Sequence, residues 1–189
     1  VFKNLYKQLK QLKPDAIYIG GDVVHGKLDT SPEEVRMVAN FFLELCKIAP
    51  TIVIPGNHDC NLNNKSREDT LSPIVDLVQK ITPNLHYWKK SGVYTMDNID
   101  FGHMSIFDHD KEGNQLTDGL PNPDDSSNEH KIALFHGGVD KHFYDNGFQV
   151  EDDRVKVDTF KGYDLVLLGD IHKRQFLNEE ETIGYPGSL

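Results

Sequence analysis

Four loops in this sequence carry side chains that can bind metal ions or transfer protons. They read Gly-Gly-Asp-Val-Val-His at 20–25, Gly-Asn-His-Asp at 56–59, His-Gly-Gly at 136–138 and Gly-Asp-Ile-His at 169–172. Their candidate ligands are oxygen and nitrogen donors without a thiolate, a set that suits Mn²⁺, Fe, Zn²⁺ or Mg²⁺. A carboxylate can bridge two cations about 3.5–4 Å apart, the separation used in two-metal phosphoester hydrolysis. The pattern therefore predicts metal-assisted hydrolysis.

Each residue taken alone has a simpler interpretation. Asp22 could be a turn residue or a helix cap, and His136 a histidine at a strand end that bonds to backbone. The tetrapeptide at 56–59 resists such a reading, because a given tetrapeptide arises by chance at roughly one position in 10⁵. Four such loops in order favour a functional site. Surface or packing roles are expected for the histidines outside them, His86, His103, His109, His130 and His142.

Apolar periodicity predicts the elements that position these loops. Helices are expected over 2–12, over 32–45 after a capping box at Ser31, and over 72–81. Strands are expected at 16–19, 51–54, 92–96, 99–106, 131–135, 165–168 and 182–185. Helices alternate with strands in the first third, which implies parallel pairing there, and the later strands suggest a mixed or antiparallel sheet. The predicted fold is α/β, a two-sheet sandwich with outer helices over 1–189.

Composition narrows the class of protein. The chain has 189 residues, of which 38% are hydrophobic and 26% charged, the balance of one compact soluble domain. No apolar run approaches the roughly 20 residues of a membrane span, and two cysteines are too few for a disulfide framework. An intracellular, cytoplasmic location is expected, including the nucleoid or a phage-infected cell. The net charge of −10 argues against nucleic-acid binding by a broad basic surface, so any such contact must be local.

Much of the excess acid lies at 108–129, where glycine and proline predict a solvated loop. Its first residues resemble the start of a calcium-binding EF-hand loop. The twelfth position, however, is Gly119 instead of glutamate, and no helices are predicted on either side. Calcium binding is therefore disfavoured.

The four ordered motifs resemble those of the calcineurin-like metallophosphoesterases. His25, three residues after Asp22, and the segments at 160–169 and 184–189 are typical of the Mre11/SbcD branch of DNA repair exonucleases. The resemblance implies a four-layer α/β fold and a metal-dependent DNA nuclease, exonuclease or endonuclease, that acts in recombination or repair. It also implies two divalent metal ions, Mn²⁺ before Mg²⁺, Fe or Zn²⁺.

The resemblance implies a role for each site residue. The metal ligands would be the bridging Asp22, then Asn57, His136 and Asp170 on the second metal and His172 on the first. His58 would contact the scissile phosphate and help the leaving oxygen depart, and His25 would assist on the substrate side.

The sequence departs from the family pattern in two places. The opening Asp-x-His motif, which gives the first metal two ligands, is expected before Val1. Without it the first metal has only Asp22 and His172, so residues 1–189 alone are expected to be impaired. Asp170 is the second departure, because the usual residue there is histidine. The DNA-capping region and the segment that joins a partner are expected beyond Leu189.

The implied partners are DNA, an SMC-like coiled-coil ATPase subunit of the Rad50/SbcC type and, as a further option, a second copy of the chain, with no membrane. Two alternatives remain open. A small-molecule or protein phosphoesterase of the same superfamily would share every metal ligand, because a fold does not fix a substrate. A non-catalytic scaffold would keep the fold but would have no use for His58. An Asp-x-His motif upstream of Val1 would favour an enzyme over a scaffold.

Overall fold

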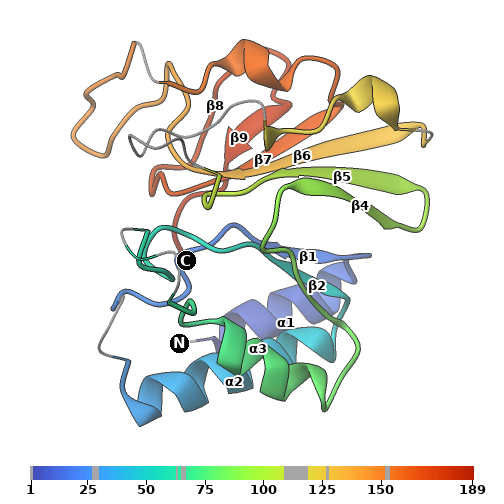
Figure 1. The fold of residues 1–189 in the computed structure, drawn as a ribbon, viewed down its shortest axis with the longest axis vertical. Coiled ribbons are helices and arrows are strands. Elements are labelled where there is room, and N and C mark those ends of the chain that lie inside the picture. The colour runs from blue at the N-terminus through green and yellow to red at the C-terminus, as the bar shows by residue number, and fades with distance from the viewer. Residues whose placement is uncertain are drawn as a thin grey trace. The chain divides into compact units, whose positions relative to one another are not determined.

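The computed structural model describes residues 2–26, 30–62, 64, 67–108, 119–126, 128–151 and 154–189. Half of the predicted acidic loop, including His109 and all but the first residue of the stretch that resembles the start of a calcium loop, lies outside these residues. The chain divides into two compact units, Val1–Trp88 and Lys89–Leu189, each built on its own sheet (Figure 1). An α/β fold with two sheets and helices is thereby confirmed, whereas the assignment of 1–189 to one domain stays a prediction.

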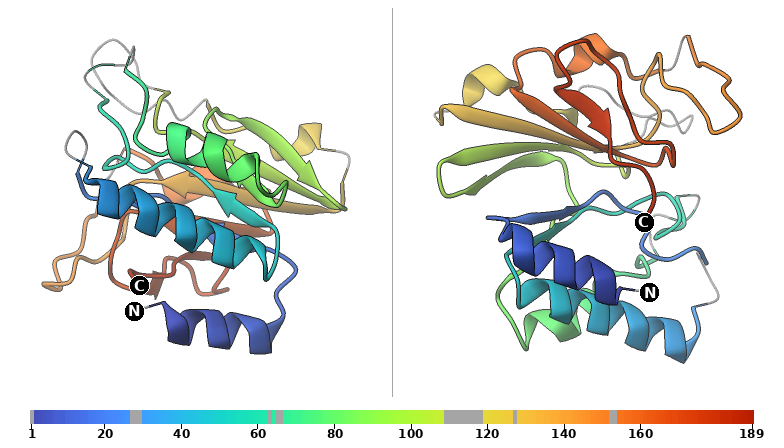
Figure 2. Two further views of the ribbon diagram at one scale, coloured as in Figure 1. Left: turned by 90° about the horizontal axis from the view of Figure 1, so that it is seen from below. Right: turned by 180° about the vertical axis from the view of Figure 1, so that it is seen from behind.

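The first unit contains a parallel sheet with helices on one of its faces (Figures 1 and 2). Its elements in chain order are α1 (Lys3–Leu12), β1 (Ile17–Ile19), α2 (Pro32–Cys46), β2 (Thr51–Val53), α3 (Ser72–Gln79) and β3 (Leu85–Tyr87). Helices and strands alternate, which confirms the predicted parallel pairing. The strand β3 was not predicted, because it has only three residues and the polar His86 stands at its centre.

Helix α2 begins as its sequence predicts. The Ser31 hydroxyl accepts a hydrogen bond from the Glu34 backbone N–H at 3.1 Å, and Pro32 occupies the first helical position. Along its inner face, Val38, Phe42 and other apolar side chains are buried in a core shared with α3 and β2. This packing holds the central strand β2, from which one of the candidate loops begins.

The second unit contains a six-stranded mixed sheet of order β4-β5-β6-β7-β9-β8. Its strands are β4 (Gly92–Met96), β5 (Ile99–Met104), β6 (His130–His136), β7 (Leu165–Gly169), β8 (Gln175–Phe176) and β9 (Ile183–Tyr185). The inner four strands run parallel, and the two edge strands pair antiparallel with their neighbours. The mixed sheet was predicted, but the two-residue strand β8 was not. The 3-10 helix at Val157–Phe160 contributes Phe160 to the core beside Phe135 and Leu168.

None of the helices in the described ranges is long and apolar enough to cross a membrane.

His103 shows the packing role expected for histidines outside the four loops. It is fully buried on β5, where its Nδ1 atom lies 3.3 Å from the Leu134 carbonyl oxygen. Burial lowers the pKa of His103 to about 4, although the Leu134 carbonyl and Asp108 oppose this shift. His103 is therefore neutral in the folded chain near neutral pH.

We expect His103 to make folding stability depend on pH between about 6.5 and about 4. Because the folded pKa lies below the unfolded one, its contribution is complete above pH 6.5. As the pH falls toward 4, the unfolded chain gains a proton that the folded chain does not, and stability is lost at up to about 1.4 kcal/mol per pH unit. Urea unfolding of His103→Gln should show a flatter pH dependence than the unchanged chain. His130→Gln, at an exposed position, is the control, and an equal slope for His103→Gln and the unchanged chain would refute this role.

Candidate metal centre

The first candidate loop leaves β1 through two residues in the left-handed region. Gly21 has a φ of 91° and Asp22 a φ of 54°, and aspartate is one of the few non-glycine residues that adopts this region readily. The Asp22 Oδ1 atom accepts a hydrogen bond from the His58 backbone N–H at 2.8 Å. This hydrogen bond holds the Asp22 carboxylate against the second candidate loop and fixes its orientation, which a metal ligand needs.

The Asp59 carboxylate connects these two loops through hydrogen bonds. Its side chain is fully buried, and its Oδ1 and Oδ2 atoms accept hydrogen bonds from the backbone N–H groups of Val24 at 3.0 Å and Gly56 at 2.8 Å. Each loop thus donates to a different oxygen of one carboxylate. Asp59 acts as a positioning residue, a role that sequence analysis did not assign to it. The signal was present, since the acid comes directly after the Asn57-His58 pair.

The imidazoles of His25 and His58 lie stacked on one another. Their ring centroids are 4.9 Å apart and the rings are inclined by 14°. The Nδ1 atom of His58 lies 3.2 Å from the His25 carbonyl oxygen, which only a protonated Nδ1 can satisfy as a donor. The Nε2 atom of His58 is then the ring nitrogen left to exchange a proton: it accepts one in the neutral ring and donates one only when both nitrogens are protonated. The two predicted catalytic residues are thus brought together.

Asn57 has the environment expected of a metal ligand. Its side-chain Oδ1 atom is buried and has no hydrogen-bond partner within the part of the chain that the structure describes. A buried amide oxygen without a partner is costly in free energy, so such atoms require an explanation. A cation bound to this oxygen would remove the cost.

In the second unit, His136 and Asp170 lie side by side at the ends of neighbouring strands. His136 ends β6 and is paired in register with Gly169 of β7, and Asp170 follows with a φ of 90°. The His136 Nε2 and Asp170 Oδ1 atoms are 3.8 Å apart, too far for a hydrogen bond. Two ligands that each lie about 2.0–2.2 Å from one ion would have such a separation. The donor set and spacing of this pair therefore fit a divalent cation.

His172 does not join this pair within the described part of the chain. Its side chain is exposed, and its backbone carbonyl accepts a hydrogen bond from the Ser188 N–H at 3.1 Å. Gly187, with a φ of 85°, approaches that carbonyl so closely that an added Cβ would lie 2.9 Å from its oxygen. The backbone at His172 is therefore fixed, and its role as a ligand stays a prediction.

Tyr185 positions the loop that follows His136. Its hydroxyl donates to the Gly137 carbonyl at 2.8 Å and accepts from the Val139 N–H at 3.0 Å, and the side chain is buried. Gly137 has a φ of 153°, and an added Cβ would lie 2.7 Å from the Phe135 ring. The buried phenol thus fixes both sides of a loop in which only glycine fits. Sequence analysis placed Tyr185 in a family-typical segment but gave it no role.

Tyr185→Phe should weaken metal binding by about 10-fold, because partners that orient ligands typically contribute 10- to 100-fold to affinity. The change removes one hydroxyl and leaves the packing of the ring intact. Calorimetric titration with Mn²⁺ measures the effect. Tyr163→Phe is the matched control, since its hydroxyl also donates to a backbone carbonyl of the same unit, that of Pro121 at 2.8 Å. Equal affinities for the two variants would exclude this role for Tyr185.

Comparisons with known proteins identify the family of this chain. Residues 1–174 match the model of the calcineurin-like phosphoesterase family. The chain is 45% identical over 193 residues to "Uncharacterized protein R555" of Acanthamoeba polyphaga mimivirus. The matched region covers all of this chain but only 14% of that protein.

Two solved structures are similar in fold. One is TT1561 of Thermus thermophilus, with a TM-score of 0.55 and 16% identity over 97% of this chain and 81% of that one. Another has a TM-score of 0.58 and 11% identity, and the similarity covers 97% of this chain and 84% of that one. At these identities the likeness supports the fold alone.

Proposed function

Because the chain belongs to the calcineurin-like phosphoesterase family, we propose that it cleaves phosphodiester bonds of DNA with two divalent metal ions. Family membership itself implies a metal-dependent hydrolase of phosphoesters. The observation that carries the nuclease proposal is the stacked pair of His25 and His58. The leaving group of a DNA strand is a sugar oxygen, which departs poorly unless it gains a proton. His58 is anchored through Nδ1, and its doubly protonated ring would donate the Nε2 proton that such a leaving group requires.

The donor sets of both units support the metal proposal. We assign Asp22 as the bridging ligand, with Asn57, His136, Asp170 and His172 as the other ligands. When bound, divalent cations supply positive charge to the phosphoryl group and lower the pKa of water toward neutrality. Mn²⁺ suits the carboxylate and amide oxygens, and the alternatives are Mg²⁺ for the same oxygens and Fe or Zn²⁺ for the imidazoles.

The residues of the chain then divide the remaining work. Asp59 fixes two loops by accepting one backbone hydrogen bond from each, and the His58 N–H orients the Asp22 carboxylate. His58 gives its Nε2 proton to the leaving sugar oxygen. His25 keeps that ring in place through its carbonyl and its stacked imidazole. These residues thus supply positioning and a proton, whereas charge neutralisation would come from the bound cations.

The proposal extends to the complete protein. The chain spans 14% of the length of the mimivirus relative, so further segments are expected to contribute to substrate binding. We propose that an SMC-like coiled-coil ATPase, of the kind that the family resemblance implies, acts with the nuclease on DNA in the cytoplasm. A second copy of the chain is a further partner to test.

A substrate panel tests this function. We expect the protein with Mn²⁺ to cleave DNA oligonucleotides, whose leaving sugar oxygen needs a proton from His58. As a diesterase it should also hydrolyse bis-p-nitrophenyl phosphate at least about 10-fold faster than the monoester p-nitrophenyl phosphate. A preference for the monoester would favour a small-molecule or protein phosphatase. No hydrolysis of any substrate with any of the four metals would favour a scaffold.

A further inference from the structure

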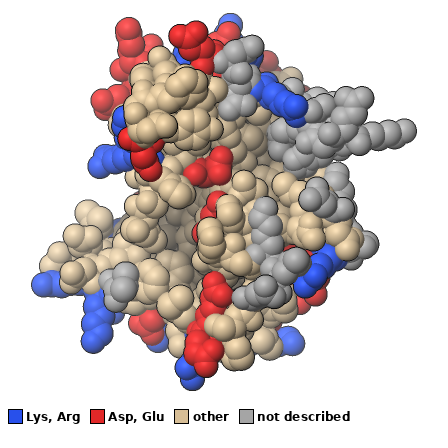
Figure 3. Space-filling view, turned by 90° about the vertical axis from the view of Figure 1, so that its left-hand side faces the viewer, with Lys and Arg blue, Asp and Glu red and all other residues tan. Residues whose placement is uncertain are grey.

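Helix α1 differs in charge from the rest of the chain. Residues 2–13 contain four lysines and no acidic residue, whereas the whole chain has 20 basic and 30 acidic residues. On the face drawn in Figure 3, the coloured acidic and basic side chains are interspersed. A nucleic acid that contacts this acidic chain therefore needs a local basic surface, and α1 offers one.

Among the lysines of α1, Lys10 lies in the last turn, where the helix dipole favours a base, but Lys3 is not placed for helix stability. Lys3 is the first helical residue, where the helix dipole favours an acid, and no acid lies in the first turn. A solvated helix usually carries charges of alternating sign that pair three or four residues apart. Lys3, Lys7 and Lys10 form no salt bridge within the described ranges. Lys10 helps to lower the pKa of Glu44 on α2, but the hydrogen bond from Lys47 is the larger cause, and Glu44 is paired with Lys47.

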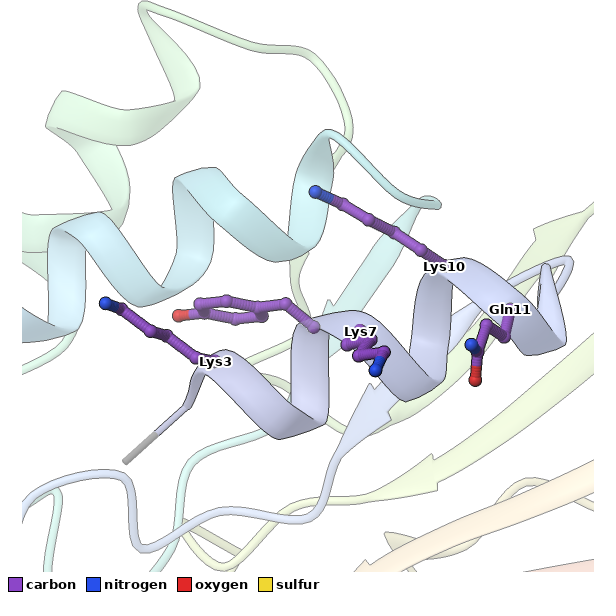
Figure 4. A pocket seen from close by; sticks show the side chains of 5 residues that line it. Lys3, Lys7, Lys10 and Gln11 are labelled. Carbon is purple, nitrogen blue, oxygen red and sulfur yellow. The ribbon is translucent and has the colours of Figure 1, made fainter.

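The same face of α1 is hollowed. A depression of about 480 Å³, open to solvent, is lined by Lys3, Tyr6, Lys7, Lys10 and Gln11. Figure 4 shows the labelled lysines and Gln11 projecting from this side of the helix. Tyr6 is half-buried, and its ring centroid lies 6.3 Å from those of Phe2 and Phe41. The depression thus combines exposed cations with a half-buried aromatic ring and an amide.

The direction of α1 determines where its lysines lie relative to the Asp22 loop of the same unit. Lys13, with a φ of 50°, ends the helix, and β1 begins after a short connection and runs back along it (Figure 2). The start of α1 and the end of β1 therefore lie at the same edge of the sheet. Lys3 is at the edge where the Asp22 loop begins, and Lys10 lies about 10 Å further along the helix at 1.5 Å per residue.

We propose that the lysine row of α1, defined as Lys3, Lys7 and Lys10, binds the sugar–phosphate backbone of single-stranded DNA that leads to the active site. This inference rests on the proposed nuclease function. The row presents three cations, so it can neutralise up to three phosphates of one strand. Tyr6 offers a ring against which a base can stack. A narrow row with one aromatic ring suits one strand better than a duplex.

Fluorescence anisotropy of a labelled single-stranded oligothymidylate, measured on the complete chain in chelator across a range of salt, tests the proposal. The variant Lys3→Gln/Lys7→Gln/Lys10→Gln removes three charges but keeps helix-forming residues. Each phosphate contact contributes about 0.7 to the slope of log affinity against log salt, so the slope should fall by about 2. Affinity near 0.1 M salt should then fall by about 100-fold. The matched control is Lys80→Gln/Lys90→Gln/Lys161→Gln, three exposed lysines elsewhere, and should bind within about threefold of the unchanged chain.

Two further measurements separate the outcomes. Hydrolysis of bis-p-nitrophenyl phosphate should be unaffected in the lysine variant, because the row touches no reacting atom. Equal DNA affinity and salt slope in that variant and the unchanged chain would overturn the inference, even if the diester is hydrolysed. A loss of binding to polyglutamate without a loss for DNA would assign the row to an acidic protein and also overturn it. An unchanged chain that binds the oligonucleotide through α1 but hydrolyses no diester would support the row and contradict the proposed function.

Discussion

His58→Ala should lower the rate of DNA cleavage by about 10²–10⁴-fold, the range that general acid–base catalysis contributes. The Nδ1 atom of His58 is committed to the His25 carbonyl, so Nε2 is the atom available to the leaving oxygen. Metal affinity should change little, because the hydrogen bond that orients Asp22 comes from the His58 backbone, which alanine retains. Single-turnover cleavage of a labelled oligonucleotide measures the first effect and calorimetry the second.

The leaving group distinguishes proton donation from a structural role for His58. A p-nitrophenolate departs without a proton, so His58→Ala should slow bis-p-nitrophenyl phosphate hydrolysis far less than DNA cleavage. A structural defect would slow both equally. His130→Ala, at an exposed histidine of β6, is the control for loss of an imidazole. Full DNA cleavage by His58→Ala would remove this residue from the mechanism.

Substitutions of Asp170 should have a large effect on metal binding. The Asp170 Oδ1 atom lies 3.8 Å from His136 Nε2, a separation that suits two ligands of one ion and not a direct hydrogen bond. Asp170→Ala should therefore remove one of two bound ions from the full-length protein. Asp170→His should retain the ion but shift preference from Mn²⁺ toward Zn²⁺ or Co²⁺, because imidazole replaces a hard oxygen donor.

Metal counts on metal-stripped protein after titration decide between direct ligation and an orienting role. Asp145→Ala, at an exposed aspartate of the same unit, controls for the loss of one negative charge. If Asp170 only orients His136 or His172, Asp170→Ala should bind the same number of ions with lower affinity. An unchanged count would thus reject Asp170 as a ligand.

Local sequence was sufficient for most of the framework. The Ser31 cap and apolar periodicity located α2, and continuous apolar runs located β2, β6 and β7. The strands β3 and β8 were not predicted because each is short and includes a polar residue, His86 or Gln175, so that their pairing partners define them. Helix α1 was visible as an amphipathic pattern, but the hollow beside Tyr6 depends on how that helix packs on α2.

For the candidate site too, some residues could be predicted from the sequence and others only from the structure. Sequence located the ligand-bearing loops at strand ends, since parallel strands place their carboxyl ends at one edge. It did not reveal Asp59 and Tyr185 as supports, because their partners are distant in the chain. Asp59 bonds to a residue 35 positions away and Tyr185 to one 48 positions away. A buried carboxylate or phenol is recognised as a positioning group only when the backbone groups around it are known.

The most direct measurement is the initial rate of cleavage of a labelled DNA oligonucleotide by metal-stripped full-length protein as Mn²⁺ is added. Cleavage should be absent in chelator, rise as two ions bind, and remain at least about 10²-fold lower in His58→Ala at saturating metal. Cleavage that persists in excess chelator, or that appears with none of Mn²⁺, Mg²⁺, Fe and Zn²⁺, would contradict a metal-dependent nuclease built on these residues.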